Sequence, residues 1–187
     1  TIGMVGIMDD FSTRMTLDYK QAGDQILLIG AQQNDIASSE YLHKLKGVEY
    51  SPAPHFELEE EFAVQQFVAA IIREKHIQSA HDISEGGLIV TLIEKGFNQN
   101  LGFDVAATTN LRTDAYWLGE SQSRVVVSCS PQELAAIQQK AAAANIPVTV
   151  LGTVTTGNIA VNGADWGNIS SWKEKYDTAI EKIIAGA

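Results

Sequence analysis

The chain carries two kinds of apolar pattern, which together predict alternating strands and helices. Uninterrupted or alternating apolar runs predict strands, and the clearest is residues 25–30, a run typical of a strand covered on both faces. Apolar residues three and four positions apart predict helices, of which residues 58–75 form the longest. Further strands are predicted at residues 2–7, 77–80, 102–107, 124–129, 147–154 and 158–161, and further helices at residues 38–45, 88–98, 113–119, 130–145 and 169–185.

The order of these elements favours an α+β fold, a layered mixed sheet with helices, over a doubly wound parallel sheet. Thr156 and Gly157 are turn residues and predict a hairpin between the last two strands, which a wholly parallel sheet does not contain. The final helix is expected to bury one apolar face. That face carries Trp172, Tyr176, Ile180, Ile183 and Ile184.

Length and composition indicate a globular chain of one domain or slightly more. It has 187 residues, of which 45% are hydrophobic and 19% charged. We expect residues 23–187 to form the domain and residues 1–22 to be a connector. No apolar run has the length of a membrane span and no signal peptide is present, so no membrane association is expected. Thr1 directly precedes a strand-like stretch, which indicates a sequence that starts within a longer protein. We therefore expect any targeting segment or further domain to lie outside this sequence.

Charge and cysteine content narrow the function classes. The net charge of −10 disfavours nucleic acid as a partner, because a phosphate backbone requires clustered Lys and Arg. Phosphorylated small molecules are not excluded, since they need only local donors and a metal. Cys129 is the only cysteine and alternates with Val127 in an apolar strand. It is expected to be a small core residue in a reducing compartment, and a cytoplasmic location follows.

The first motif is residues 81–88, which read His-Asp-Ile-Ser-Glu-Gly-Gly-Leu between a predicted strand and a predicted helix. One interpretation is a site for a phosphate with a divalent cation, because glycines allow close backbone approach, a helix N-terminus attracts anions, and carboxylates bind Mg²⁺. The other is purely structural. In that interpretation Ser84 caps the helix, Glu85 lies in its first turn, and Gly86 and Gly87 are loop glycines.

The second motif is residues 119–124, which read Gly-Glu-Ser-Gln-Ser-Arg before an apolar strand. A structural interpretation pairs Glu120 with Arg124 and lets the hydroxyl groups satisfy backbone groups. A functional interpretation treats the segment as a cluster of donors and acceptors that holds a polar ligand, because loops on rigid strands commonly carry binding residues. The pattern alone leaves both interpretations open.

Four segments, in this order, resemble the C-terminal domain of the aminoimidazole ribonucleotide synthetase superfamily. They are Gly23-Asp24 ahead of an apolar strand, Ser39-Glu40-Tyr41-Leu42, and the first and second motifs. Within the superfamily the chain looks most like the phosphoribosylformylglycinamidine synthases of the small-subunit type, whose chains contain this domain twice. The two motifs resemble those of the second copy. The Gly-Met-Val-Gly stretch at residues 3–6 resembles the segment that links the preceding ATP-binding domain to this one.

The resemblance implies an ATP- and Mg²⁺-dependent ligase of purine biosynthesis that converts formylglycinamide ribonucleotide to its amidine, using ammonia from a separate glutaminase subunit. It implies that the ATP-binding domain and the first repeat lie outside this chain. We therefore expect the chain alone to be inactive and to self-associate through an exposed apolar face. The resemblance assigns no catalytic residue. It places the nucleotide at Asp82, Ser84, Gly86 and Gly87, the metal at Asp82, and the substrate at Glu120, Ser121 and Gln122.

One departure and two alternatives accompany this resemblance. Residues 37–41 read Ala-Ser-Ser-Glu-Tyr where the family has Gly-Gly-Ser-Glu-Tyr, which weakens a phosphate-binding role for that loop. The family's two copies form two similar clefts, so these motifs fit either a live or an auxiliary site.

One alternative is the same domain in an aminoimidazole ribonucleotide synthetase, a selenophosphate synthetase, a thiamine-phosphate kinase or a hydrogenase maturation factor. The other is a non-catalytic half that scaffolds an active site.

Overall fold

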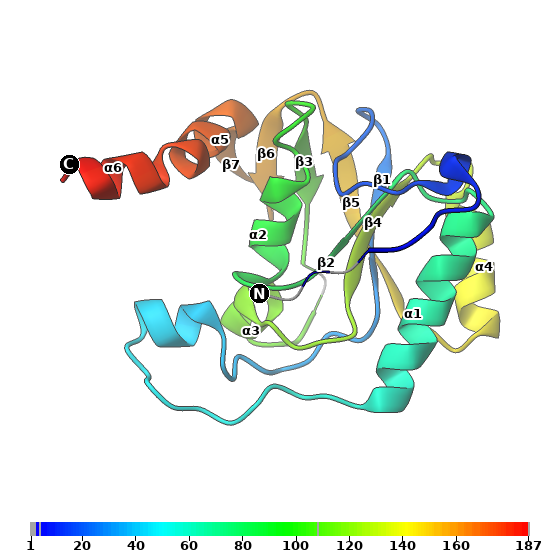
Figure 1. Cartoon of the computed structure of the whole chain (residues 1–187), viewed down its shortest axis with the longest axis horizontal. Coiled ribbons are helices and arrows are strands. Elements are labelled where there is room, and N and C mark those ends of the chain that lie inside the picture. The colour runs from blue at the N-terminus through cyan, green and yellow to red at the C-terminus, as the bar shows by residue number, and fades with distance from the viewer. Residues whose placement is uncertain (1–2, 4, 108, 187) are drawn as a thin grey trace.

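The computed structural model describes residues 3, 5–107 and 109–186, and its strands form one seven-stranded mixed sheet (Figure 1). The strand order is β2-β4-β1-β5-β3-β6-β7, and every neighbouring pair is antiparallel except β3 and β6. The strands are β1 (Gln25–Ile29), β2 (Ser79–Asp82), β3 (Gly102–Val105), β4 (Val125–Cys129), β5 (Val148–Thr155), β6 (Asn158–Val161) and β7 (Ala164–Asn168).

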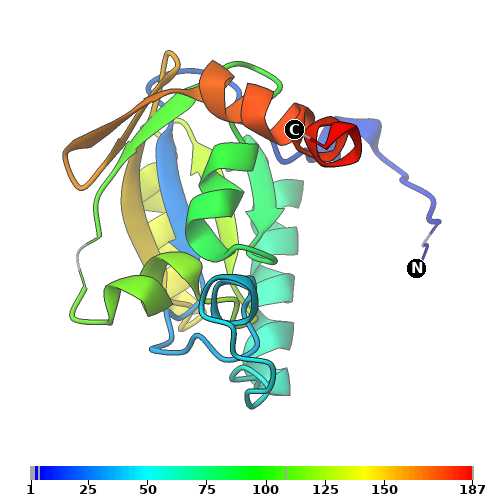
Figure 2. The same cartoon turned by 90° about the vertical axis from the view of Figure 1, so that its left-hand side faces the viewer.

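Helices cover both faces of this sheet. Figures 1 and 2 show α2 and α3 on one side and α1 and α4 on the other. The helices are α1 (Leu58–Arg73), α2 (Gly87–Glu94), α3 (Thr113–Leu118), α4 (Leu134–Ala143), α5 (Ile169–Asp177) and α6 (Ala179–Ala185), with a short 3₁₀ turn η1 (Phe11–Thr13) and a π-helical turn η2 (Tyr41–Leu45). The layered α+β fold predicted from the sequence is confirmed.

The central strand β1 divides the core into two halves. Successive strand side chains point to opposite faces, so Ile26 and Leu28 pack with Leu92 on the α2 side, whereas Leu27 packs with Ile71 on the α1 side. All four apolar side chains of residues 26–29 are fully buried. This explains why the segment reads as an uninterrupted apolar run, and the prediction of a strand covered on both faces is confirmed.

Cys129 ends β4 as a fully buried thiol in the core on the α1 side. Burial, with smaller contributions from Asp24 and Glu133, raises the pKa of this thiol to about 12. The thiol is therefore protonated at neutral pH and is a poor nucleophile. The expected role of Cys129 as a small core residue is confirmed.

The hairpin predicted around Thr156 and Gly157 is wrong. β5 and β6 are consecutive in sequence, but β3 lies between them and pairs with β5 on one side and β6 on the other. The alternating pattern fixes which face each residue takes but not which strand lies beside it. The hairpin instead joins β6 to β7 through Asn162 and Gly163, whose φ values of 52° and 76° suit a two-residue turn.

The C-terminal arm, residues 169–185, is not the buried amphipathic helix that the sequence predicts. It is divided into α5 and α6, which extend away from the sheet in Figure 1. Ile169 is fully buried and Trp172 packs against the core, but beyond them the predicted face is exposed, with Ile183 at 78% and Ile184 at 81%. Tyr176 and Ile180 are exposed as well. The apolar periodicity of this arm therefore marks an uncovered ridge.

The N-terminal segment also departs from prediction. In the strand predicted at residues 2–7, the described residues 3 and 5–7 form no strand, and Val5 and Ile7 are almost fully exposed. The remaining residues of that prediction lie outside the described part of the chain. Among the described residues, no helix combines the length and apolar content needed to cross a membrane.

Candidate functional site

The two motifs lie side by side and line one pocket of about 350 Å³, which we call the motif pocket. β2 and β4 are neighbouring antiparallel strands with Asp82 opposite Val125, so the end of one motif strand meets the beginning of the other. β2 lies two residues further along the chain than predicted, at both its start and its end, and therefore includes His81 and Asp82. The motif residues that line the pocket are Asp82, Ile83, Ser84, Glu85, Glu120, Gln122, Ser123 and Arg124.

Glu120 fastens the two motifs together. Its Oε1 accepts the backbone N–H of Gly86 at 2.9 Å and that of Glu40 at 2.8 Å. One carboxylate oxygen thus joins the start of α2, the loop before η2 and the second motif, which are far apart in sequence. The predicted pair between Glu120 and Arg124 is absent from the ion pairs of the described residues, because the guanidinium of Arg124 bonds instead to backbone carbonyls of its own loop.

The start of α2 is built by glycine rather than by a serine cap. Gly86 and Gly87 have φ values of 85° and 71°, a left-handed conformation that favours glycine. A Cβ at Gly87 would lie 2.7 Å from the carbonyl carbon of Leu118, so the two motifs touch through their backbones. The Ser84 side chain makes no capping bond, and the predicted Ser84 cap with Glu85 in the first turn is wrong because the helix begins at Gly87.

The helix start also differs from an open anion site. The Gly86 N–H donates to Glu120, and the Gly87 N–H donates to the carbonyl of Ser84 at 3.0 Å. A carboxylate near the positive end of a helix is stabilising. A protein carboxylate therefore takes one of the donors that the phosphate interpretation of the first motif requires.

Asp82 is an exposed carboxylate at the motif pocket. Its side chain is 76% exposed, and its Oδ1 lies 3.3 Å from Nδ1 of His81. The other imidazole nitrogen of His81 lies 3.1 Å from Glu94 on α2. His81 is thus held between two carboxylates, and Asp82 remains free to reach a ligand.

The donor set fits a shared Mg²⁺ ion better than a closed metal cage. Within the part of the chain that the structure describes, no group of three or more His, Cys, Asp or Glu side chains is arranged to hold a metal. The pocket nevertheless brings together the carboxylates of Asp82, Glu85, Glu120 and Glu61. Mg²⁺ commonly uses one or two carboxylates together with waters and substrate phosphates. The residues present are compatible with that mode, and the Asp82 carboxylate is accessible to a ligand.

Three of the predicted site residues lie beneath the pocket surface or at its edge. Ser121 is only 1% exposed, and its hydroxyl has no hydrogen-bond partner. Gly87 is buried against the backbone of the second motif, and Gly86 contacts Glu120. None of the three is among the residues that line the pocket.

The sequence analysis missed the contribution of α1. Glu61 lines the motif pocket, and its Oε2 accepts the hydroxyl of Ser123 at 2.6 Å. Gln65, one turn further along the helix, lines the pocket as well. Both residues stand on the polar side of an amphipathic helix, where the sequence carries no signal that separates a pocket wall from a solvated surface.

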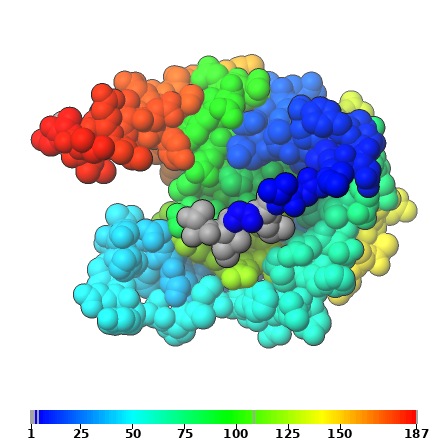
Figure 3. Space-filling view, viewed as in Figure 1, coloured from blue at the N-terminus to red at the C-terminus, as the bar shows by residue number. Residues whose placement is uncertain are grey.

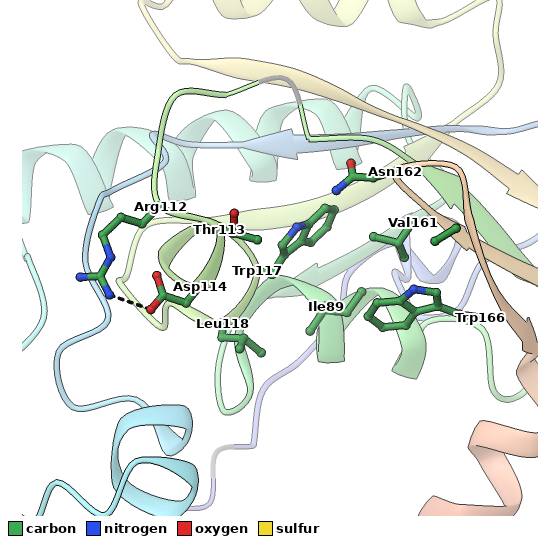
Figure 4. A pocket seen from close by; sticks show the side chains of 10 residues that line it. Ile89, Arg112, Thr113, Asp114, Trp117, Leu118, Val161, Asn162 and Trp166 are labelled. Carbon is green, nitrogen blue, oxygen red and sulfur yellow. Dashed lines mark hydrogen bonds and ion pairs between the residues drawn. The ribbon is translucent and has the colours of Figure 1, made fainter.

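A second, larger pocket of about 820 Å³ lies between α2, α3 and the β6–β7 hairpin (Figure 4). Its walls are apolar and include Ile89, Trp117 and Trp166, while the ion pair of Arg112 and Asp114, at 2.7 Å, lies at one end. None of the residues that line it belongs to either motif, although Ile89 and Leu118 directly adjoin the two motifs in sequence. Size alone therefore does not mark the candidate site, because the polar and ionisable motif residues gather in the smaller pocket.

The fold and the paired motifs define a known class of domain. The chain belongs to the family described as AIR synthase related protein, C-terminal domain, which it matches over residues 21–162. This membership confirms the superfamily resemblance.

Individual relatives narrow the class. The chain is 40% identical over 153 residues to phosphoribosylformylglycinamidine synthase subunit PurL of Alkaliphilus metalliredigens, covering 82% of this chain and 21% of that protein. It is 36% identical over 195 residues to the same subunit of Chlorobaculum tepidum, covering 98% and 26%. The chain thus spans about a quarter of the length of the curated relatives it matches.

Solved structures share the fold. PurL of Thermotoga maritima complexed with FGAR superposes with a TM-score of 0.70 at 16% identity, covering 87% of this chain and 30% of that one. The same protein complexed with ATP gives a TM-score of 0.67 at 15% identity, covering 87% and 28%.

Proposed function

We propose that this chain is the C-terminal part of a phosphoribosylformylglycinamidine synthase. The whole enzyme would be an ATP-dependent C–N ligase that converts formylglycinamide ribonucleotide to its amidine with ammonia derived from glutamine. One observation carries the proposal: two sequence-distant motifs of the family meet at one pocket through the Glu120 carboxylate. The relatives at 30–40% identity support the choice of this synthase over other members of the superfamily.

The motif pocket would supply one wall of a nucleotide and substrate site. Asp82 would hold Mg²⁺ jointly with nucleotide phosphates, and Ser84 would border the same phosphates, supported from behind by the turn at Gly86 and Gly87. When bound, the metal would offset phosphate charge. Because the pocket itself is acidic, a polyphosphate would need that cation to enter. Glu120 and Gln122 would form the substrate side, with Ser121 packed directly beneath them, and the Glu120 carboxylate also keeps the loop in place.

The proposal includes partners outside this chain. An N-terminal ATP-binding domain, a first copy of this domain and a glutaminase subunit would complete the enzyme, which we place in the cytoplasm. This chain alone would then be inactive with ATP, Mg²⁺ and ammonia. Detectable amidine formation by the purified 187-residue chain would contradict this division of labour.

The proposal is tested by Asp82→Asn in a full-length synthase that carries this chain. The substitution removes a charge but preserves size, so we expect Mg-ADP to bind about tenfold more weakly while the melting temperature barely changes. Asp104→Asn, at an exposed position in β3, is the matched control. Calorimetric titration measures the affinity of each variant for Mg-ADP. Equal affinities for wild type and Asp82→Asn would refute the metal role.

A scaffolding role is the second candidate, because Glu120 uses its carboxylate on two backbone donors of the protein itself. In a scaffold, Asp82→Asn and Gln122→Ala would leave turnover of the full-length enzyme unchanged. In the synthase site, both would lower the apparent affinity for a ligand. Steady-state kinetics with each ligand varied in turn separates the two functions.

We also expect the isolated chain to self-associate through the C-terminal arm. Figure 3 shows this arm and the segment around residues 41–57 projecting on the same side, with a recess between them. Exposed apolar side chains occupy both, including Ile183, Ile184 and Tyr50, and contiguous exposed apolar surface commonly marks an interaction site.

The test replaces Ile180, Ile183 and Ile184 with serine and follows the mass by light scattering over a concentration series. The wild-type chain should grow in mass with concentration, whereas the variant should remain smaller. Glu181→Ser with Lys182→Ser, on the same helix, controls for the loss of side chains. A wild-type chain that is monomeric throughout would disprove this expectation.

A further inference from the structure

Arg124 brings a buried guanidinium to the wall of the motif pocket. Its side chain is 3% exposed, and it makes three hydrogen bonds, each to a neutral oxygen. Nε donates to the carbonyl of Ser121 at 2.9 Å and Nη2 to that of Gly119 at 2.8 Å, while Nη1 donates to Oε1 of Gln32 at 3.0 Å. The planar guanidinium therefore clamps the backbone immediately before and after Glu120.

Several buried polar groups around Arg124 make no hydrogen bonds of their own. The hydroxyls of Ser121 and Tyr116 and the amide nitrogen of Gln32 are buried without hydrogen-bond partners. Among the described residues no carboxylate lies within ion-pair distance of Arg124. Burial lowers the pKa of Arg124 to about 10, although Asp35 and Glu120 raise it in part, so the guanidinium stays charged at neutral pH. The loop thus depends on charge-assisted bonds to its carbonyls.

The loop that contains Gly30 packs against the second motif and holds its end in place. Gly30 lies so close to the carbonyl of Ser123 that a Cβ there would overlap its oxygen. Ser123 itself has a φ of 62°, a conformation uncommon for a residue with a side chain, and its hydroxyl is bonded to Glu61. The second motif is therefore anchored at Ser123, and Arg124 determines the path of the segment that precedes it.

We propose that Arg124 is the positioning residue that aims the Glu120 carboxylate at the N–H groups of Gly86 and Glu40, and so keeps the two motifs in one pocket. Arg124 binds the carbonyl groups of Gly119 and Ser121, which flank Glu120. It therefore fixes the backbone that carries the Glu120 carboxylate. The role within a catalytic cycle rests on the proposed function, but the positioning itself does not.

Amide hydrogen exchange on the 187-residue chain tests the positioning directly. In Arg124→Met, the loop loses its clamp, so we expect the amides of Gly86 and Glu40 to exchange about tenfold faster or more, while those of Val126 and Val127 in β4 change little. Arg124→Lys keeps the charge but not the planar fork, and is expected to restore protection only in part. Arg112→Lys, on an exposed arginine, is the matched control.

A double variant separates positioning from a general structural role. Glu120→Ala removes the acceptor, so adding Arg124→Met to it should accelerate the Gly86 and Glu40 amides no further. The proposal is overturned by unchanged exchange at these two amides in both Arg124 variants. It is equally overturned by an acceleration that spreads evenly over β4, or by an additive effect in the double variant. Because the readout is amide exchange, these outcomes are independent of whether the synthase function holds.

Discussion

Gly87→Ala is expected to lower the free energy of unfolding by about 3 kcal/mol or more, whereas Gly163→Ala is expected to cost about 1 kcal/mol. Both glycines have similar left-handed φ values, 71° and 76°. A Cβ at Gly163 meets nothing within 4 Å, while at Gly87 it would lie 2.7 Å and 2.8 Å from backbone atoms of Leu118 and Gly119. The pair thus separates backbone strain from the close approach of the two motifs.

Urea unfolding of the two variants measures this difference. Backbone atoms have no rotamer to adopt, so relief at Gly87 requires α2 and the second motif to move apart. We therefore expect Gly87→Ala also to loosen the Gly86 N–H bond to Glu120. Equal losses of stability in the two variants would show that the close approach is not tight in solution.

Lys95 is expected to make the stability of the domain rise with pH across the neutral range. It follows α2 with its side chain fully buried, and its Nζ donates to the carbonyl of Leu17 at 2.8 Å and to the hydroxyl of Ser79 at 2.9 Å. Burial lowers the pKa of Lys95 from 10.5 to about 7; the charge of Lys20 lowers it further and that of Asp18 opposes the shift. Burial raises the pKa of Tyr19, whose ring lies beside the ammonium, so its phenol stays neutral.

The sign follows from the number of protons bound. Below about pH 7 both the folded and the unfolded chain hold the proton, and the folded state bears the full cost of a buried charge. Between about 7 and 10.5 the unfolded chain binds more protons than the folded one, so stability rises with pH through this window. Between pH 6 and pH 9 the gain is on the order of 2–3 kcal/mol.

Lys95→Met keeps the length of the side chain and removes its titration. The difference in unfolding free energy between wild type and variant, measured in urea at pH 6 and pH 9, should therefore shift toward the wild type at the higher pH. Other titrating groups are common to both proteins and cancel in this difference. Parallel pH profiles for the two proteins would contradict a lowered pKa for Lys95.

Local sequence pattern predicts those elements whose apolar residues are all covered by the core. β1 and β4 read correctly because both of their faces are covered, and α1 read correctly because one side faces the core. The predicted burial of the C-terminal arm failed for the opposite reason. The periodicity of Ile180, Ile183 and Ile184 shows that these residues share a side of the helix, but it holds no information on whether anything covers that side.

The candidate site was predictable as two motifs but not as an arrangement. Their resemblance to a family indicated that residues 81–88 and 119–124 act together, and both motifs line the motif pocket. The bond from Glu120 to Gly86 and Glu40 was not predictable, because it joins segments that no short-range pattern connects. Arg124 seemed by spacing to be a partner of Glu120, yet its geometry places it under the loop instead.

The central position of β1 has a consequence for biosynthesis. Gln25 pairs with Cys129 and also with Thr153, so β1 must wait for both of its neighbouring strands to be made. At ribosomal speeds of 5–20 residues per second, the roughly 100 residues up to β4 take on the order of 5–20 s. During that interval the apolar residues 26–29 of β1 have neither of their partner strands, β4 and β5. We therefore expect the nascent chain to keep these apolar residues exposed until its second half has been translated.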